Sequence, residues 1–149
     1  APYYSLKLQD YAAVVAITDE QQVLIVRQYR PAVERDTLEL PSGLVDAGET
    51  PGEAARRELL EETGYDAAVV EDLGPMLPDS GRLGNRIFSC VATGLRRVPG
   101  RTPEEGIAVL AWPLDELVRA TADGRFDHAL HVAVVLVAVL KGRLRLPGV

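Results

Sequence analysis

The spacing of apolar and polar positions along the chain predicts an α/β domain. Apolar stretches at 11–18 and 22–28 read as two strands joined by a polar turn, which predicts a hairpin near the N-terminus. A short strand is expected in "TLELPSG", where Pro41 and Gly43 end it, and longer strands at 66–72, 85–93 and 107–112. Helices are expected in "WPLDELVRATADG" and at 127–141. Strands and helices therefore interleave, which predicts the α/β class. The sheet is expected to be mixed, because both hairpins and crossovers connect its strands.

The segment 50–64 carries the strongest helix pattern in the sequence. Thr50 and Glu53 form a capping box, and Pro51 occupies the first helical position, where its missing N–H costs nothing. Gly64 is placed to end the helix. These residues define both ends of a helix inside the acidic stretch 43–65.

Three glutamates of this helix share one face. Glu58, Glu61 and Glu62 are three and four residues apart, so they project within an arc of about 100° and repel one another. They also lie toward the C-terminal end of the helix, where the macrodipole favours cations. Spacing alone leaves two interpretations open. One is a solvated acidic face, and the other is a site for Mg²⁺ or Mn²⁺, which prefer hard oxygen ligands.

Composition and charge narrow the class of protein. The chain has 149 residues and a formal net charge of −6, which argues against general nucleic-acid binding. Its longest apolar run, 129–140, is too short to cross a bilayer, so no membrane partner is expected. The single cysteine, Cys90, cannot form an internal disulfide. We interpret Cys90 as a buried strand residue and expect a cytoplasmic location.

The stretch from residue 43 to residue 65 resembles the Nudix box, the motif of hydrolases that cleave a nucleoside diphosphate linked to another moiety. All seven fixed positions of the motif are present: Gly43, Glu49, Arg57, Glu58, Glu61, Glu62 and Gly64. The resemblance implies a Nudix-type α/β/α sandwich with a mixed sheet, formed by a single domain over residues 1–149. It also implies a small nucleotide as substrate.

The resemblance also implies roles for the residues of the box. Glu58 and Glu62 would hold Mg²⁺ or Mn²⁺, with Glu61 as a further ligand or as the holder of the catalytic water. The backbone carbonyl of Ser42, just before the box glycine, would complete the metal shell. The remaining box residues would be structural, and the pair Glu49 and Arg57 would brace the loop against the helix.

The segment "VLIVRQYRPAVERDTLELPSGLVDAGE" resembles the lead into the box in ADP-ribose pyrophosphatases and their nucleotide-sugar relatives. It implies that Arg30 binds the substrate diphosphate, where a guanidinium can hold two oxygens at once. For Arg27, a second substrate contact and a solvated charge are equal alternatives, and Leu44 is expected on the substrate side. A loop glutamate acts as general base in these relatives, and here Glu105 is favoured over Glu104.

The main hypothesis is metal-dependent hydrolysis of the pyrophosphate bond of ADP-ribose or a similar nucleoside diphosphate sugar. The products would be a nucleoside monophosphate and a sugar phosphate. The alternatives are a Nudix hydrolase of another nucleotide and a non-catalytic sensor of nucleotide sugars. Ser80 stands where the ADP-ribose subgroup commonly has a proline, which leaves the base and the sugar open. A homodimer is implied. We interpret His128 and His131 as the polar edge of a packed helix rather than as a metal site.

Overall fold

The chain folds into strands and helices that alternate as the sequence predicts. The computed structural model describes residues 1–148. Its strands are β1 (Tyr11–Ala16), β2 (Gln22–Arg30), β3 (Arg35–Glu39), β4 (Ser42–Leu44), β5 (Tyr65–Met76), β6 (Ile87–Arg97) and β7 (Ala108–Pro113). Its helices are α1 (Pro51–Thr63), α2 (Leu114–Ala122) and α3 (Ala129–Leu140). The predicted α/β class is confirmed. Across residues 1–148, no helix is both long and apolar enough to span a membrane.

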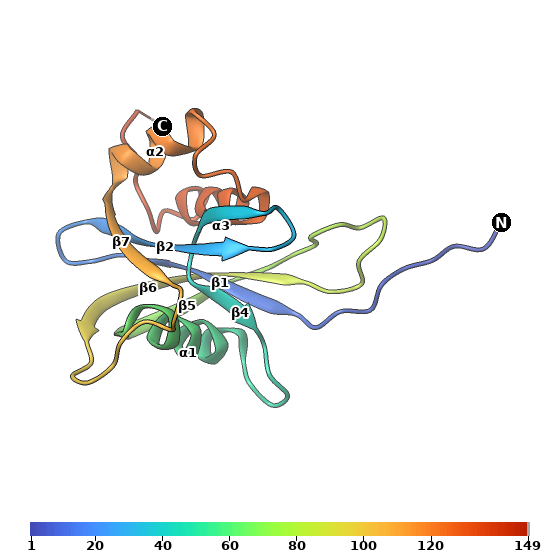
Figure 1. The fold of residues 1–149 in the computed structure, drawn as a ribbon, viewed down its shortest axis with the longest axis horizontal. Helices are drawn as coiled ribbons and strands as arrows, with labels where there is room; N and C mark the ends of the chain where they lie inside the picture. The colour runs from blue at the N-terminus through green and yellow to red at the C-terminus, as the bar shows by residue number, and fades with distance from the viewer. Residues whose placement is uncertain (149) are drawn as a thin grey trace.

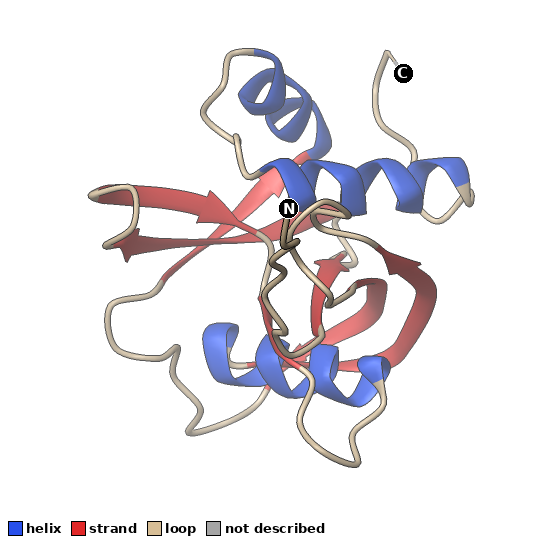
Figure 2. Cartoon of the chain, turned by 90° about the vertical axis from the view of Figure 1, so that its right-hand side faces the viewer, coloured by secondary structure: helices blue, strands red, loops and turns tan. Residues whose placement is uncertain are grey.

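The strands form two sheets that lie between helices. One sheet has four strands in the order β4-β1-β6-β5, and only its β1–β6 pair is parallel, so it is mixed as predicted. The other sheet is antiparallel, in the order β3-β2-β7. Helix α1 lies on one side of the strands, and α2 and α3 lie on the other (Figures 1 and 2). This arrangement is the expected α/β/α sandwich.

The predicted N-terminal hairpin is wrong. β1 and β2 belong to different sheets, and a single bridge between Ile17 and Val23 joins them at the turn. Each strand finds a longer partner elsewhere, β1 along β6 and β2 along β7. Periodicity shows that a segment is extended, but the partner of a strand depends on segments far away in the sequence.

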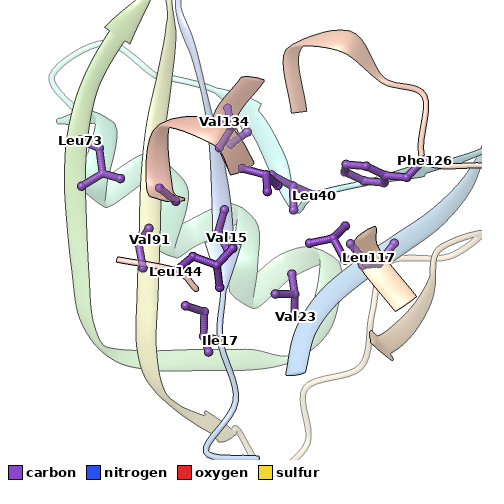
Figure 3. Close-up of a cluster of buried hydrophobic side chains, with 14 of the residues drawn as sticks. Val15, Ile17, Val23, Leu40, Leu73, Val91, Leu117, Phe126, Val134 and Leu144 are labelled. Carbon is purple, nitrogen blue, oxygen red and sulfur yellow. The ribbon is translucent and has the colours of Figure 1, made fainter. Parts of the chain in front are cut away.

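Two apolar layers hold the sandwich together. Along β1, Ala12 and Val14 face the cluster under α1, whereas Ala13 and Val15 face the cluster under α2 and α3. Successive side chains of a strand point to opposite faces, so one strand supplies both layers. Figure 3 shows Val15 with Val134 and Phe126 in the second layer. Cys90, on β6, is buried in the first layer as predicted, and burial raises the pKa of its thiol to about 12.

The segment "TLELPSG" forms two strands where the sequence predicts one. β3 pairs with β2, and β4 pairs with β1, so the chain changes sheets at Leu40 and Pro41. Leu40 is completely buried. The crossing places Ser42 and Gly43 in front of α1, and these residues begin the candidate site.

Candidate active site

Helix α1 presents the site's carboxylates, and its caps lie where the sequence predicts. The Thr50 hydroxyl accepts the Glu53 N–H at 3.3 Å, and the Glu53 carboxylate accepts the Thr50 N–H at 2.8 Å. Gly64 ends the helix with φ 76°, a left-handed conformation that glycine adopts without strain. Leu59 is completely buried against the sheet. Because Leu59 fixes the rotation of the helix, the neighbouring glutamates are directed toward β4.

Arg57 joins the loop before the helix to the carboxylates on it. Its guanidinium donates to both oxygens of Glu49, at 2.8 and 3.0 Å, and to the Leu44 carbonyl at 2.8 Å. The same side chain donates to Glu58 and, at 3.4 Å, to Glu61. The hydrogen bond from Arg57 lowers the pKa of Glu49. The pair of Glu49 and Arg57 therefore has the bracing geometry that the resemblance implies.

Glu62 is a buried carboxylate whose negative charge few neighbouring groups offset. Only 6% of the residue is exposed, and one oxygen accepts the Ser42 N–H at 3.0 Å. Burial, helped by the nearby charges of Glu58 and Glu39, raises the pKa of Glu62 to about 8, although the Ser42 hydrogen bond and the charge of Arg30 oppose this rise. A bound cation would offset the cost of this charge.

The backbone of Ser42 faces the same carboxylate. The Val14 N–H donates to the Pro41 carbonyl at 3.0 Å, and Ala13 is the residue opposite Ser42. This pattern makes Ala13 and Ser42 a non-hydrogen-bonded pair, in which both residues turn N–H and C=O away from each other. The Ser42 N–H reaches Glu62, so the Ser42 carbonyl is directed to the same edge. The implied metal-binding carbonyl therefore lies on the side of the carboxylates.

Gly43 leaves room for a second, partly buried carboxylate, that of Glu58. A Cβ on Gly43 would collide with the carboxylate of Glu58, which lies directly against the glycine. Burial raises the pKa of Glu58, although the hydrogen bond from Arg57 opposes this effect. A side chain at position 43 would therefore push Glu58 out of place.

Arg30 is held by a buried carboxylate that the sequence analysis missed. Its Nε and Nη2 donate to the two oxygens of Glu39, at 2.9 and 2.7 Å, and Glu39 is only 2% exposed. Burial raises the pKa of Glu39, but the hydrogen bonds from Arg30 and Thr37 outweigh it and hold the pKa at about 2. The charge of Arg30 also acts on Glu62. A charged residue between Leu38 and Leu40 in an apolar strand was the available signal for this role.

The other two predicted substrate residues, Arg27 and Leu44, are more exposed than Arg30. Arg27 is half exposed and lies 4.0 Å from Asp36. It is three positions from Arg30 in a regularly paired strand, so it points to the opposite face. Leu44 is 50% exposed at the end of β4, where a ligand can reach it. The structure therefore brings Arg30 to the cluster but not Arg27.

The loop before β7 carries both candidate general bases to the end of α1. The Glu104 N–H donates to the Glu61 carbonyl at 3.1 Å. The charge of Glu104 adds to the burial that raises the pKa of Glu58. Glu105 is exposed in the turn that ends at Gly106, which has φ 85°. Both residues are exposed.

Comparisons with known proteins agree with this geometry. The chain is 34% identical over 126 residues to "Methanol dehydrogenase activator" of Bacillus methanolicus. This match covers 82% of this chain and 68% of the relative. It is 36% identical over 128 residues to "ADP-ribose pyrophosphatase" of Mycobacterium tuberculosis, covering 83% of this chain and 62% of the relative. A solved structure titled "Crystal structure of ADP compounds hydrolase" matches with a TM-score of 0.78 at 26% identity, over 91% of this chain and 75% of the other.

The share of the chain that each comparison covers decides what can be said of its family. The chain spans less than two thirds of the Mycobacterium tuberculosis relative, so it represents only part of that protein's length. The family model described as "NUDIX domain", however, matches residues 7–140, which include every strand and helix of the sandwich. The chain therefore belongs to the Nudix family.

Proposed function

We propose that this chain hydrolyses the pyrophosphate bond of ADP-ribose or a similar nucleoside diphosphate sugar. The observation that carries the proposal is the placement of two carboxylates with raised pKa values, the partly buried Glu58 and the buried Glu62, beside Gly43 and the Ser42 backbone. The printed names of the Mycobacterium tuberculosis relative and of the similar solved structure support an ADP-containing substrate.

Mg²⁺ or Mn²⁺ fits the donor set of this site. Carboxylate and carbonyl oxygens are the ligands that these hard cations prefer. We assign Glu58 and Glu62 as the principal ligands, with Glu61 and the Ser42 carbonyl completing the set. When bound, such cations neutralise the diphosphate and lower the pKa of a coordinated water. A raised pKa for the buried Glu62 supports this assignment, because an added positive charge would favour its ionised form.

The remaining residues orient the substrate and take a proton. Arg30 uses Nε and Nη2 on Glu39, which leaves Nη1 to donate to a diphosphate oxygen. Glu105, or its neighbour Glu104, accepts a proton from the attacking water. The water oxygen joins one phosphorus, and the bridging P–O bond breaks. A nucleoside monophosphate and a sugar phosphate leave.

A hydrolysis panel with Mg²⁺ tests the substrate. We expect turnover of ADP-ribose to exceed that of a nucleoside triphosphate, a dinucleoside polyphosphate and an oxidised nucleotide. Equal rates on ADP-ribose and the triphosphate would contradict the nucleotide-sugar assignment. Tight binding of ADP-ribose without turnover would instead support a sensor, so binding is measured beside activity by calorimetry.

Assembly and location complete the proposal. The resemblance implies a homodimer, which sedimentation of the purified chain at several concentrations would test. The cytoplasmic location stays a prediction based on the lone cysteine, Cys90, which is buried and free of disulfides.

A further inference from the structure

A buried histidine holds the chain where it changes sheets. His131, in the first turn of α3, is 1% exposed, and its Nδ1 accepts the Leu40 N–H at 3.0 Å. Residues 131 and 40 are far apart in sequence, and the bond joins α3 to the crossing between β3 and β4. Leu40 also packs in the same apolar layer as Val134 of α3 (Figure 3). Helix α3 therefore contacts both the side chain and the backbone of Leu40.

The geometry around His131 argues against a metal site there. Glu39, His128 and His131 each offer a ligand atom, and these atoms lie within 4.8 Å of one another. Burial lowers the pKa of His131 to about 3, so the ring is neutral. A neutral ring whose Nδ1 accepts a hydrogen bond carries its proton on Nε2, and neither nitrogen then has a free lone pair. Glu39 is already bound by Arg30 and Thr37.

Hydrogen bonds also hold Pro41 and Ser42, the two residues after Leu40. The Pro41 carbonyl accepts the Val14 N–H at 3.0 Å, and the Ser42 N–H donates to Glu62 at 3.0 Å. Three consecutive residues of the crossing are thus anchored by α3, β1 and α1. Without the His131 acceptor, the Leu40 N–H would be buried without a partner, and such a group costs enough to displace the segment.

We propose that His131 is a positioning residue, which sets the place of the Ser42 backbone against Glu62 from the opposite side of the sandwich. The proposal rests on the proposed function, in which the Ser42 carbonyl and Glu62 bind the divalent cation. His131 touches neither the cation nor the substrate. It acts through Leu40 and Pro41 on the distance between the two ligands.

Binding of Mn²⁺ to the intact chain without substrate tests this role. His131→Asn keeps an oxygen acceptor near the position of Nδ1, whereas His131→Gln moves the amide one bond farther and His131→Leu removes the acceptor. We expect His131→Asn to bind Mn²⁺ like the wild type. We expect His131→Gln and His131→Leu to bind Mn²⁺ about tenfold more weakly, which is the typical effect of losing a residue that orients a metal ligand. Free Mn²⁺ is measured by electron paramagnetic resonance, and thermal unfolding is recorded for every variant.

His128→Asn is the matched control. His128 is half-buried and stacks on His131 with ring centroids 3.7 Å apart, but the Leu40 N–H donates to His131 and not to His128. We expect its Mn²⁺ affinity to match that of the wild type. The proposal would be overturned by wild-type affinity in both His131→Gln and His131→Leu, since a lower melting temperature alone would mean a purely structural role. It would also be overturned if His128→Asn and His131→Asn both lost one bound equivalent of metal.

Failure of the proposed function gives a different result. Glu62→Gln serves as the positive control, and wild-type Mn²⁺ affinity in this variant would overturn the metal site and, with it, the role of His131. Absence of ADP-ribose hydrolysis in a wild type whose Mn²⁺ affinity depends on His131 would contradict only the substrate assignment.

Discussion

Replacing Glu62 with glutamine tests the buried carboxylate on which the proposed site depends. Glutamine has nearly the same shape, and its amide oxygen can still accept the Ser42 N–H, so Glu62→Gln removes a charge with little repacking. Glu62 is 6% exposed, which leaves little room for solvent to screen that charge. The variant therefore separates the cost of the charge in the metal-free fold from its use in binding metal.

The size of the effect follows from the pKa of Glu62, which burial raises from 4.5 to about 8. The folded protein therefore holds this proton more tightly than the unfolded chain does. The resulting stabilisation is fully present below the unfolded pKa and is lost as pH rises through the folded pKa. At about 1.4 kcal/mol for each pKa unit, the whole loss is about 5 kcal/mol. The variant, having no charge, avoids this loss.

We expect metal-free Glu62→Gln to be more stable than the wild type by about 3 to 5 kcal/mol at about pH 9. At about pH 5 the difference should fall to about 1 kcal/mol or less, because the wild-type carboxyl is then protonated in the fold. Urea unfolding in the presence of a chelator measures both values. Hydrolysis of ADP-ribose with Mg²⁺ should meanwhile lose about three orders of magnitude in kcat or more.

Glu20→Gln is the control, because Glu20 lies exposed in the turn after β1. We expect it to change neither stability nor kcat appreciably. A gain in stability for Glu62→Gln that is equal at both pH values would refute the raised pKa of Glu62. Retention of kcat in Glu62→Gln would refute its role as a metal ligand, whatever the stability shows.

Four further predictions test other parts of the site. Gly43→Ala places a Cβ against a catalytic carboxylate, so we expect Mn²⁺ affinity to fall about tenfold or more, and an unchanged titration would contradict this. Arg30→Ala should raise KM for ADP-ribose by about 10- to 100-fold, because a charged hydrogen bond to the diphosphate is lost. Glu39→Gln should raise KM in the wild type but not in Arg30→Ala, and equal effects in both backgrounds would show that Glu39 acts independently. Of Glu104→Gln and Glu105→Gln, the variant of the general base should lose about 10²- to 10⁴-fold in kcat with KM retained. Normal kcat in both would exclude this loop from proton transfer.

Local sequence was sufficient to predict helix α1 and the positions of its glutamates. The capping box of Thr50 and Glu53 and the glycine at Gly64 were predicted, and the structure has them. Such features involve residues within one turn of each other, so they can be read without knowing the rest of the fold. The same holds for the face shared by Glu58 and Glu62, which depends only on helical geometry.

The pairing of strands could not be read in the same way. The sequence predicted a hairpin from the segments around Asp19, but β1 pairs with β6 and β2 pairs with β7. Local alternation is equally consistent with either arrangement, because side-chain direction repeats every two residues whatever the partner. The split of "TLELPSG" between two sheets is a result of the same kind.

Local sequence was enough to predict the family motif, the α/β class and the carboxylates that the proposed chemistry needs. Only the folded chain shows that Arg30 is held by Glu39, that the Ser42 N–H donates to Glu62, and that His131 holds the sheet crossing. The physical reason is burial. The cost of a buried charge or N–H is set by the groups that the fold brings around it, and these come from segments that are far apart in the chain.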